Sequence, residues 1–511
     1  MRRHAVRGAF LVLIAAAVTA CGDGSNGSAA AQISVPNVLG DSQAAATTAL
    51  TGAGLTVGTV TQASSATVAV GSVVSQTPSA DTSAAKGSSV ALVISTGPQT
   101  HTVGGTLIGL TGSATVHILN GADNVPISAN GSFTLPTAVA GGGHYNVTVG
   151  APTSAQTCAV QNGSGTVASA NVTNVLVYCT YAVTAATLNN TYTSAVADFA
   201  TVENGSPVTV DAAVIATYDG TGAYSGTSTV NNAGIIVPGV AVSGTYAVNT
   251  TNAIPALTNN SGASGGIEGI NGDSTVGIGM TSGAAPGIAI AVLPNAAATT
   301  ASINGNYTLV NLTAQLSTGN IYGYEGAGTL TNGVLSGTYT ENSGGTITTG
   351  NPASGQWSVT NGVVTSVGSA SGAVSADGDL IILADTNSGD DPYINVAVLR
   401  GSGVTQRTFE GVYSVAEYGG TPVTSTFGKA ITLFAYGDGT YSVTFAKNAN
   451  GTITTNNTGT GTYTVAADGT LMLTDPAGDV ENGAISADGN ALVLASVASG
   501  QNPAIFVGVR Q

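Results

Sequence analysis

The stretch that decides the fold of the first domain begins Val35-Pro36-Asn37-Val38-Leu39-Gly40 and ends Gly87-Ser88-Ser89-Val90-Ala91-Leu92-Val93-Ile94-Ser95-Thr96-Gly97-Pro98. Between these ends lie an Ala- and Thr-rich run and two further Val-rich segments. Short Val-rich runs bounded by Gly, Pro and Asp are typical of β-strands. The pattern therefore predicts strands over residues 56–62, 73–76 and 90–95.

The Ala- and Thr-rich run predicts one helix over residues 43–53. Ser42 is suited to the N-cap, and Gly54 to the left-handed position that commonly ends a helix. Ala46, Leu50 and Ala53 recur at helical spacing, so they are expected to face the sheet.

This helix and these strands, with the Gly- and Lys-containing turn before the last strand, resemble a PASTA domain over residues 34–98. The family is a small extracellular module of some penicillin-binding proteins and bacterial serine/threonine kinases. The resemblance implies a place in a bacterial cell envelope and peptidoglycan as the partner. Helices of this family usually carry many charges on their outer face. Here that face is formed by Gln43, Thr47, Thr48 and Thr51, so no charge-based ligand contact is implied.

The N-terminus has the form of a targeting segment. Arg2, Arg3 and Arg7 precede an apolar run over residues 9–17 that is too short to span a bilayer. The next four residues, Val18-Thr19-Ala20-Cys21, resemble the lipobox of bacterial lipoproteins.

This resemblance implies a signal peptide over residues 1–20 and a diacylglyceryl group on Cys21. Residues 21–33, which are small and polar, would then be a flexible tether. The lipoprotein would lie on the periplasmic face of the outer membrane or on the cell surface. An ordinary secretory signal followed by a chance cysteine is the alternative.

The charge balance excludes one class of partner. Residues 1–20 hold three arginines and no acidic residue, so the remaining chain carries six basic and 25 acidic residues, a net charge of −19. Such a chain should repel nucleic acid. Apolar residues make up 43% and glycine accounts for 72 residues, which favours many short strands joined by tight turns over disorder.

Residues 99–182 predict a β-sandwich spacer of immunoglobulin or transthyretin type, because short alternating segments are separated by Gly, Asn and Pro. With Cys21 lipidated, Cys158 and Cys179 remain, and a secreted chain is expected to pair them in a disulfide. Closing a loop of this length should contribute about 3 kcal/mol of stability.

The rest of the chain contains a degenerate repeat. Each copy has an apolar residue four before a tyrosine, a Tyr-Gly-Gly turn cluster, a Gly-x-aromatic triplet, and a glycine twenty residues before a proline. The last marker is Gly266 with Pro286, Gly372 with Pro392, and Gly483 with Pro503, which gives a period of 106 to 111 residues between the glycines. A unit of this length can bury its own core.

The fold class predicted for the whole chain is therefore mainly β and multidomain. The three repeats are expected to be tandem antiparallel β-barrels or sandwiches over residues 183–298, 299–404 and 405–511. Their opening strand and meander order are similar to lipocalin and avidin-type barrels. The repeated tyrosines, Tyr192, Tyr307 and Tyr413, are expected to play a structural role at a barrel floor.

Two catalytic motifs occur in the sequence, but each lacks the partner residues that its chemistry needs. Ser83-Ala84-Ala85-Lys86 fits the Ser-x-x-Lys pattern of penicillin-recognising enzymes, but the partner motifs are absent. Gly262-Ala263-Ser264-Gly265-Gly266 fits a nucleophile elbow, but no histidine follows His144 to act as the base. We expect no enzyme activity and no cofactor.

One acidic hairpin is a candidate calcium site. It contains Asp385, Asn387, Asp390 and Asp391, whose oxygens could hold calcium. The distal glutamate of the full calcium-loop signature is missing, so a solvated acidic turn is favoured and no metal is expected.

Together these features predict a non-catalytic, lipid-anchored envelope protein that binds peptidoglycan through residues 34–98. One alternative is a surface stalk or adhesin whose repeats bind other surface proteins or a matrix. The other is a carrier of small apolar ligands, which requires cavities inside the barrels rather than filled cores.

Overall fold

The computed structural model describes residues 31–511 except for short segments at 182, 199–201, 204–205, 208–209, 233–234, 252–253, 260–268, 272–273, 281–285, 316, 319, 367–369, 387–390, 421–425, 450–451 and 497–499. The chain divides into two compact units, Met1–Gln99 and Thr100–Gln511. Residues 1–30, with the predicted signal peptide and Cys21, lie outside the described part. No helix in the described part is long and apolar enough to cross a membrane.

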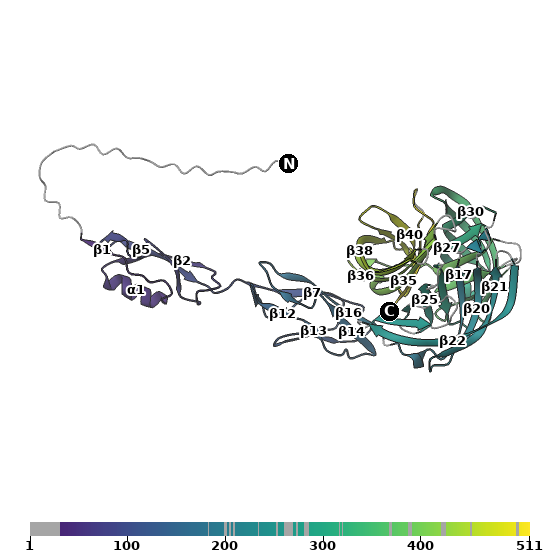
Figure 1. The fold of residues 1–511 in the computed structure, drawn as a ribbon, viewed down its shortest axis with the longest axis horizontal. Coiled ribbons are helices and arrows are strands. Elements are labelled where there is room, and N and C mark those ends of the chain that lie inside the picture. The colour runs from purple at the N-terminus through teal and green to yellow at the C-terminus, as the bar shows by residue number, and fades with distance from the viewer. Residues whose placement is uncertain are drawn as a thin grey trace. The chain divides into compact units, whose positions relative to one another are not determined.

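The first unit is a small α+β fold (Figure 1). Its elements are β1 (Gln32–Ser34), α1 (Gln43–Gly52), β2 (Thr56–Ala63), β3 (Val73–Thr77), β4 (Ser83–Ala85) and β5 (Ser89–Ser95). Strand β5 is central in a three-stranded sheet, parallel to β2 and antiparallel to β3, while β1 pairs with β4.

The helix begins and ends where the sequence predicts. Ser42 Oγ accepts the Ala45 amide at 3.2 Å, and Gly54 has φ +82°, the left-handed conformation that a glycine adopts freely. Ala46 and Leu50 are fully buried against the sheet, within an apolar cluster that also includes Val90 and Leu92. The unit therefore has a core of its own.

The second unit opens with a β-sandwich. Its strands are β6 (Thr100–His101), β7 (Val103–Ile108), β8 (Val116–Asn120), β9 (Asp123–Ile127), β10 (Gly131–Thr134), β11 (Val139–Ala140), β12 (His144–Asn146), β13 (Thr148–Val149), β14 (Gln156–Gln161), β15 (Ser164–Thr166) and β16 (Val172–Tyr181). The four-stranded sheet β10-β7-β16-β14 and the three-stranded sheet β13-β8-β9 share one apolar cluster, which makes the sandwich.

Three eight-stranded meanders follow. In the first, η1 (Ala185–Thr187) precedes a sheet of order β23-β22-β21-β20-β17-β26-β25-β24, which we call sheet 1. Its strands are β17 (Thr191–Asp198), β20 (Val210–Tyr218), β21 (Ala223–Asn232), β22 (Ile235–Thr251), β23 (Ile254–Asn259), β24 (Gly269–Ile270), β25 (Val276–Met280) and β26 (Ile288–Val292), with the small hairpin β18 (Val202–Glu203) and β19 (Ser206–Pro207) beside them.

The second meander, barrel 2, is closed and is preceded by η2 (Thr300–Ile303). Its strands are β27 (Gly305–Gln315), β28 (Asn320–Thr331), β29 (Val334–Ser343), β30 (Thr346–Thr360), β31 (Val363–Ser366), β32 (Ala370–Val374), β33 (Leu380–Asp385) and β34 (Tyr393–Leu399).

The third meander, barrel 3, is also closed and follows η3 (Gln406–Phe409). Its strands are β35 (Glu410–Gly420), β36 (Thr426–Tyr436), β37 (Thr440–Ala449), β38 (Thr452–Val465), β39 (Thr470–Thr474), β40 (Val480–Ile485), β41 (Ala491–Ser496) and β42 (Ala504–Arg510). Across the described residues, the predicted fold class is confirmed: the chain is mainly β, with one α-helix and two closed eight-stranded barrels.

The repeated tyrosines are buried at one end of each meander. Tyr192 donates its hydroxyl hydrogen to the Ser274 carbonyl at 2.6 Å, and Tyr413 donates to the Gly489 carbonyl at 2.8 Å. The aromatic residue of the Gly-x-aromatic marker fixes the 3₁₀ helix: Tyr463 donates to the Phe409 carbonyl at 3.0 Å. The contacts of Tyr192 and Tyr413 fit the structural role predicted for the tyrosines, whereas the buried hydroxyl of Tyr307 has no hydrogen-bond partner among the described residues.

The three meanders pack together through a shared core, which the sequence did not lead us to expect. One apolar cluster, the shared core, combines residues of all three: Ile288 and Ile290 of sheet 1, Val396 of barrel 2, and Val507 of barrel 3 are among its fully buried members. Because side chains alternate along a strand, neighbouring residues of these strands fill the barrel interiors instead. The three repeats are therefore not independent domains, because they share one core.

The sandwich also packs on barrel 3. Ile108, Leu176 and Tyr178 of the sandwich form an apolar cluster with Val412 and Phe434 of the barrel. The Tyr178 and Phe434 rings meet edge to face, with centroids 5.1 Å apart. The predicted spacer is thus held against barrel 3 by apolar contacts.

Candidate functional site

Barrel 3 encloses a cavity of about 300 Å³. Its apolar wall comes from inward-facing positions of the strands, and includes Leu433, Tyr441, Leu473, Leu492 and Leu494. Cavities of this size, mostly apolar with a few polar groups, are the usual form of a small-molecule site.

A partly buried ion pair lies in the wall of this cavity. Glu417 on β35 and Lys429 on β36 are directly opposite in the antiparallel register, and Lys429 Nζ lies 2.7 Å from Glu417 Oε2. Lys429 also lies over the rings of Phe427 and Phe445, with its nitrogen 5.4 and 5.5 Å from their centroids. The carboxylate, the amine and the aromatic faces compensate for the burial of both charges.

Two further carboxylates line the cavity, Glu481 on β40 and Asp475 just after β39. Burial, reinforced by the nearby Glu417 and Asp475 carboxylates and opposed by Lys429, raises the pKa of Glu481 to about 7. Asp475 Oδ1 accepts the Ala477 and Asp479 amides at 2.8 and 3.0 Å. Among the described residues, no cationic side chain forms an ion pair with either carboxylate.

The same level of barrel 2 is filled differently. By strand register, Asn311 and Tyr324 stand where barrel 3 has Glu417 and Lys429. There, Tyr324 donates its hydroxyl hydrogen to Asn395 Oδ1 at 3.0 Å, and the Tyr324 and Tyr339 rings lie 4.9 Å apart. A hydrogen-bonded plug thus occupies this part of barrel 2, whereas barrel 3 is hollow and carries charges.

The candidate calcium site does not assemble in the described part of the chain, where no cluster of His, Cys, Asp or Glu able to hold a metal is present. Asp385 is fully buried at the end of β33, and its Oδ2 accepts the Asn231 side-chain amide from sheet 1 at 2.9 Å. Asp385 therefore links barrel 2 to sheet 1. Asn387 and Asp390 lie outside the described residues, and Asp391 begins the next described segment.

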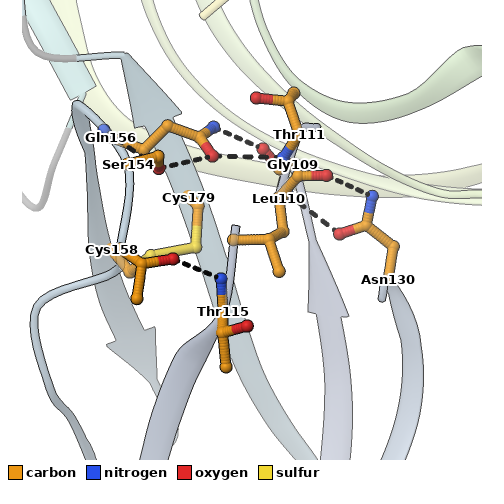
Figure 2. The surroundings of a disulfide bond; sticks show 10 residues. Gly109, Leu110, Thr111, Thr115, Asn130, Ser154, Gln156, Cys158 and Cys179 are labelled. Atoms are coloured by element: carbon orange, nitrogen blue, oxygen red, sulfur yellow. Dashed lines mark hydrogen bonds between the residues drawn. A yellow bond between two sulfur atoms is a disulfide. The ribbon is translucent and has the colours of Figure 1, made fainter. Parts of the chain in front are cut away.

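Cys158 and Cys179 form a disulfide, as predicted (Figure 2). They are directly opposite on β14 and β16, so the bond fastens an edge strand to the centre of the four-stranded sheet. Beside it, Gln156 Nε2 donates to the Gly109 carbonyl at 2.8 Å, and Gln156 Oε1 accepts the Thr111 amide at 3.1 Å (Figure 2). The surroundings of the disulfide are thus a hydrogen-bonded network.

Of the two catalytic strings in the sequence, only Ser83-Ala84-Ala85-Lys86 lies in the described part of the chain. Ser83 lies on β4, and its hydroxyl donates to Gln32 Oε1 at 2.9 Å rather than meeting Lys86. The nucleophile-elbow string, Gly262-Ala263-Ser264-Gly265-Gly266, lies outside the described residues, as does Cys21.

The surface of the first unit is almost without charge. Its described residues include only Asp41, Asp81 and Lys86 as charged side chains. On the helix, Thr47 and Thr51 donate their hydroxyl hydrogens back to carbonyls one turn earlier, at 2.8 Å each. Any ligand of this surface must therefore be held mainly by neutral hydrogen bonds and apolar contact.

With this geometry established, the family comparison identifies the first unit. A model of the PASTA domain matches residues 33–96. These residues form a PASTA domain. The match agrees with the predicted range, residues 34–98, to within two residues at either end, and it leaves the sandwich and the three meanders unassigned.

The other comparisons add little. Among solved structures, the chain is similar to the entire extracellular region of the Ser/Thr kinase PrkC from Staphylococcus aureus, at 23% identity and a TM-score of 0.13. That match covers 24% of this chain and 48% of the kinase chain, about half its length. A TM-score this low supports no inference from one molecule to the other. No curated protein sequence matches the chain.

Sequence reasoning missed the residues of the barrel 3 cavity. A usable signal exists: only 7% of the chain is charged, yet Glu417 and Lys429 interrupt apolar strands at inward positions. Recognising them as a pair required the register of β35 and β36, which sequence periodicity alone does not supply.

Proposed function

We propose that this chain is a non-catalytic, lipid-anchored protein of the bacterial cell envelope that binds peptidoglycan through its PASTA domain. The single observation that supports this function is the match of residues 33–96 to the PASTA model, together with the α+β fold of those residues. PASTA domains are associated with peptidoglycan, so the domain implies an extracellular or cell-envelope location and the glycopeptide of the wall as partner.

The electrostatics of the domain define the mode of binding. Because the described residues of the first unit include two carboxylates and one amine, attraction of opposite charges has little part in retaining the wall polymer. We therefore expect binding to depend on hydrogen bonds and apolar contact, and to survive salt that would screen a charged interface.

The proposal predicts that purified sacculi retain the full chain but not a variant that lacks residues 32–99. Removing the domain should lower the bound fraction at least about tenfold, because the sole contact surface is lost. The measurement is co-sedimentation with sacculi at low and high salt. Circular dichroism of the deletion variant checks that the remaining β structure is intact.

Two leucines provide matched point variants for the same measurement. Leu50 is fully buried in the domain core, whereas Leu39 is 52% exposed. Leu50→Ala should destabilise the domain by about 2–5 kcal/mol and release the protein from sacculi. Leu39→Ala should change stability by no more than about 0.5 kcal/mol. Equal retention of the full chain, the deletion variant and Leu50→Ala would refute the proposal.

The lipid anchor is tested separately from the wall contact. In our proposal Cys21 carries two or three acyl chains, which suffice for stable membrane attachment. Cys21→Ser is expected to move the exported protein from the membrane fraction to the soluble fraction without changing its retention by sacculi. Mass spectrometry of the N-terminal peptide reads the modification directly, and an unmodified thiol would exclude the anchor.

A second candidate function, carriage of small ligands, is favoured by the hollow interior of barrel 3. Filled cores throughout the meanders would have argued against it. The charges that line this cavity specify the ligand more closely than the sequence could.

A further inference from the structure

Barrel 3 combines an apolar cavity with an excess of carboxylates at one level. The carboxylates of Glu417, Asp475 and Glu481 and the amine of Lys429 line the same space as Leu433 and its apolar neighbours. Lys429 is already paired with Glu417 at 2.7 Å, so these two charges offset each other. A second amine, that of Lys447, lies directly opposite Lys429 on β37, with its nitrogen 5.0 Å from the Phe427 centroid, and it also acts on Glu417. Glu481 and Asp475 form no ion pair among the described residues, so three carboxylates stand against two amines here.

We propose that barrel 3 binds a small cation with an apolar body, of which a primary alkylamine is the simplest example. The apolar part lies against Leu433, Leu473, Leu492 and Leu494. The ammonium group pairs with the carboxylates of Glu481 and Asp475. This site is distinct from the PASTA domain and does not depend on peptidoglycan binding.

The aromatic lining supports a cation rather than an anion. Phe445 and Phe506 line the cavity, and Phe445 already lies under one ammonium group, that of Lys429. Aromatic faces attract cations, most strongly in sites shielded from water. An anionic head group would instead meet the negative charges of two unpaired carboxylates.

The protonation of Glu481 provides a signature for this site. The groups that act on it are Glu417, Asp475, Asp479 and Lys429, and burial with the three carboxylates raises its pKa to about 7. Above that pH the carboxylate is ionised and attracts an ammonium group, and below it the neutral acid does not. An alkylammonium ion resembles the lysine side chain and keeps its charge throughout this range.

Isothermal titration of the full chain with octylamine, octanol and octanoate tests the site, because these probes share a tail and differ in charge. Octylamine should bind most tightly, about tenfold more tightly than octanol. Its affinity should rise between pH 6 and pH 8, while that of octanol stays constant. Tighter binding of octanoate, or no detectable binding of octylamine, would overturn the proposal.

Three variants locate the site. Glu481→Gln should lower the affinity for octylamine about tenfold and remove the rise with pH, leaving octanol unaffected. Glu341→Gln removes the same charge from β29 of barrel 2. It should change neither the affinity for octylamine nor the rise of that affinity with pH. Val443 lines the cavity, so Val443→Phe should fill it and weaken the binding of both octylamine and octanol. Unchanged binding in both Glu481→Gln and Val443→Phe would place the ligand elsewhere and refute the assignment.

Discussion

Replacing Val507 with aspartate should destabilise barrel 2 although the residue belongs to barrel 3. Val507 is fully buried in the shared core, where it lies in one apolar cluster with Val310, Ile382 and Val396 of barrel 2. An unpaired carboxylate in such a site costs at least about 4 kcal/mol, a large part of the stability of a domain. We expect Val507→Asp to lower the unfolding midpoint of both barrels.

The single tryptophan of the chain makes this prediction measurable. Trp357 is buried inside barrel 2, so its fluorescence during urea unfolding reports on that barrel alone. Val334→Asp is the matched control, because Val334 lies on β29 of the same barrel as Trp357 but is 52% exposed, and its effect should be below about 1 kcal/mol. If Val507→Asp left the Trp357 transition unchanged, the barrels would be independent.

Replacing Gly372 with alanine should also destabilise barrel 2 strongly. A Cβ atom at this position would lie 1.8 Å from the Ile382 carbonyl oxygen and 2.9 Å from Leu383 Cα, both in the backbone of the neighbouring strand β33. Backbone atoms cannot move aside as a flexible side chain can, so the strand pair β32–β33 must separate. We expect a loss of about 3 kcal/mol in the free energy of unfolding.

Gly355→Ala is the control in the same barrel. The nearest heavy atom to a Cβ at Gly355 is Trp357 Nε1 at 3.5 Å, an ordinary contact, so its effect should stay within about 1 kcal/mol. Urea midpoints of the two variants, measured on the full chain, make the comparison. Equal midpoints would mean that the close approach at Gly372 can relax without cost.

The same geometry explains a marker of the repeat. Gly483, the counterpart of Gly372 in barrel 3, would place a Cβ 1.9 Å from the Val493 carbonyl oxygen. The sequence revealed these glycines by their constant distance from the following proline, but not the reason for them. The spacing between glycine and proline could be detected because the three repeats lie in one chain and can be compared. The close approach of two strands at the glycine appears only in the folded structure.

The shared core could not be predicted with equal ease. Residues 288–292, Ile288-Ala289-Ile290-Ala291-Val292, are apolar on both faces of the strand, and all five are buried. That pattern indicates a strand covered on two sides. It does not say what covers the outer face, because the covering residues belong to other repeats.

The candidate sites also differ in whether their residues are local in the sequence. The PASTA domain was recognisable because its caps, turns and strands are local in sequence, as Ser42 and Gly54 illustrate. The barrel 3 cavity was not, because Glu417 and Glu481 come from β35 and β40, strands that closure of the barrel brings to one space. The contact between Asp385 and Asn231 could not be predicted for the same reason, because Asn231 belongs to another repeat.

Linking the three meanders in one polypeptide removes a restriction that a homotrimer would impose. In an assembly of identical subunits, any hollow interior with charged walls would occur three times, and so would its penalty in stability. Here the copies have diverged, so tyrosine and asparagine side chains meet at the level of barrel 2 where barrel 3 carries Glu417 and Lys429 beside its cavity. Repeats within one chain can thus differ in their interiors while they share a common core.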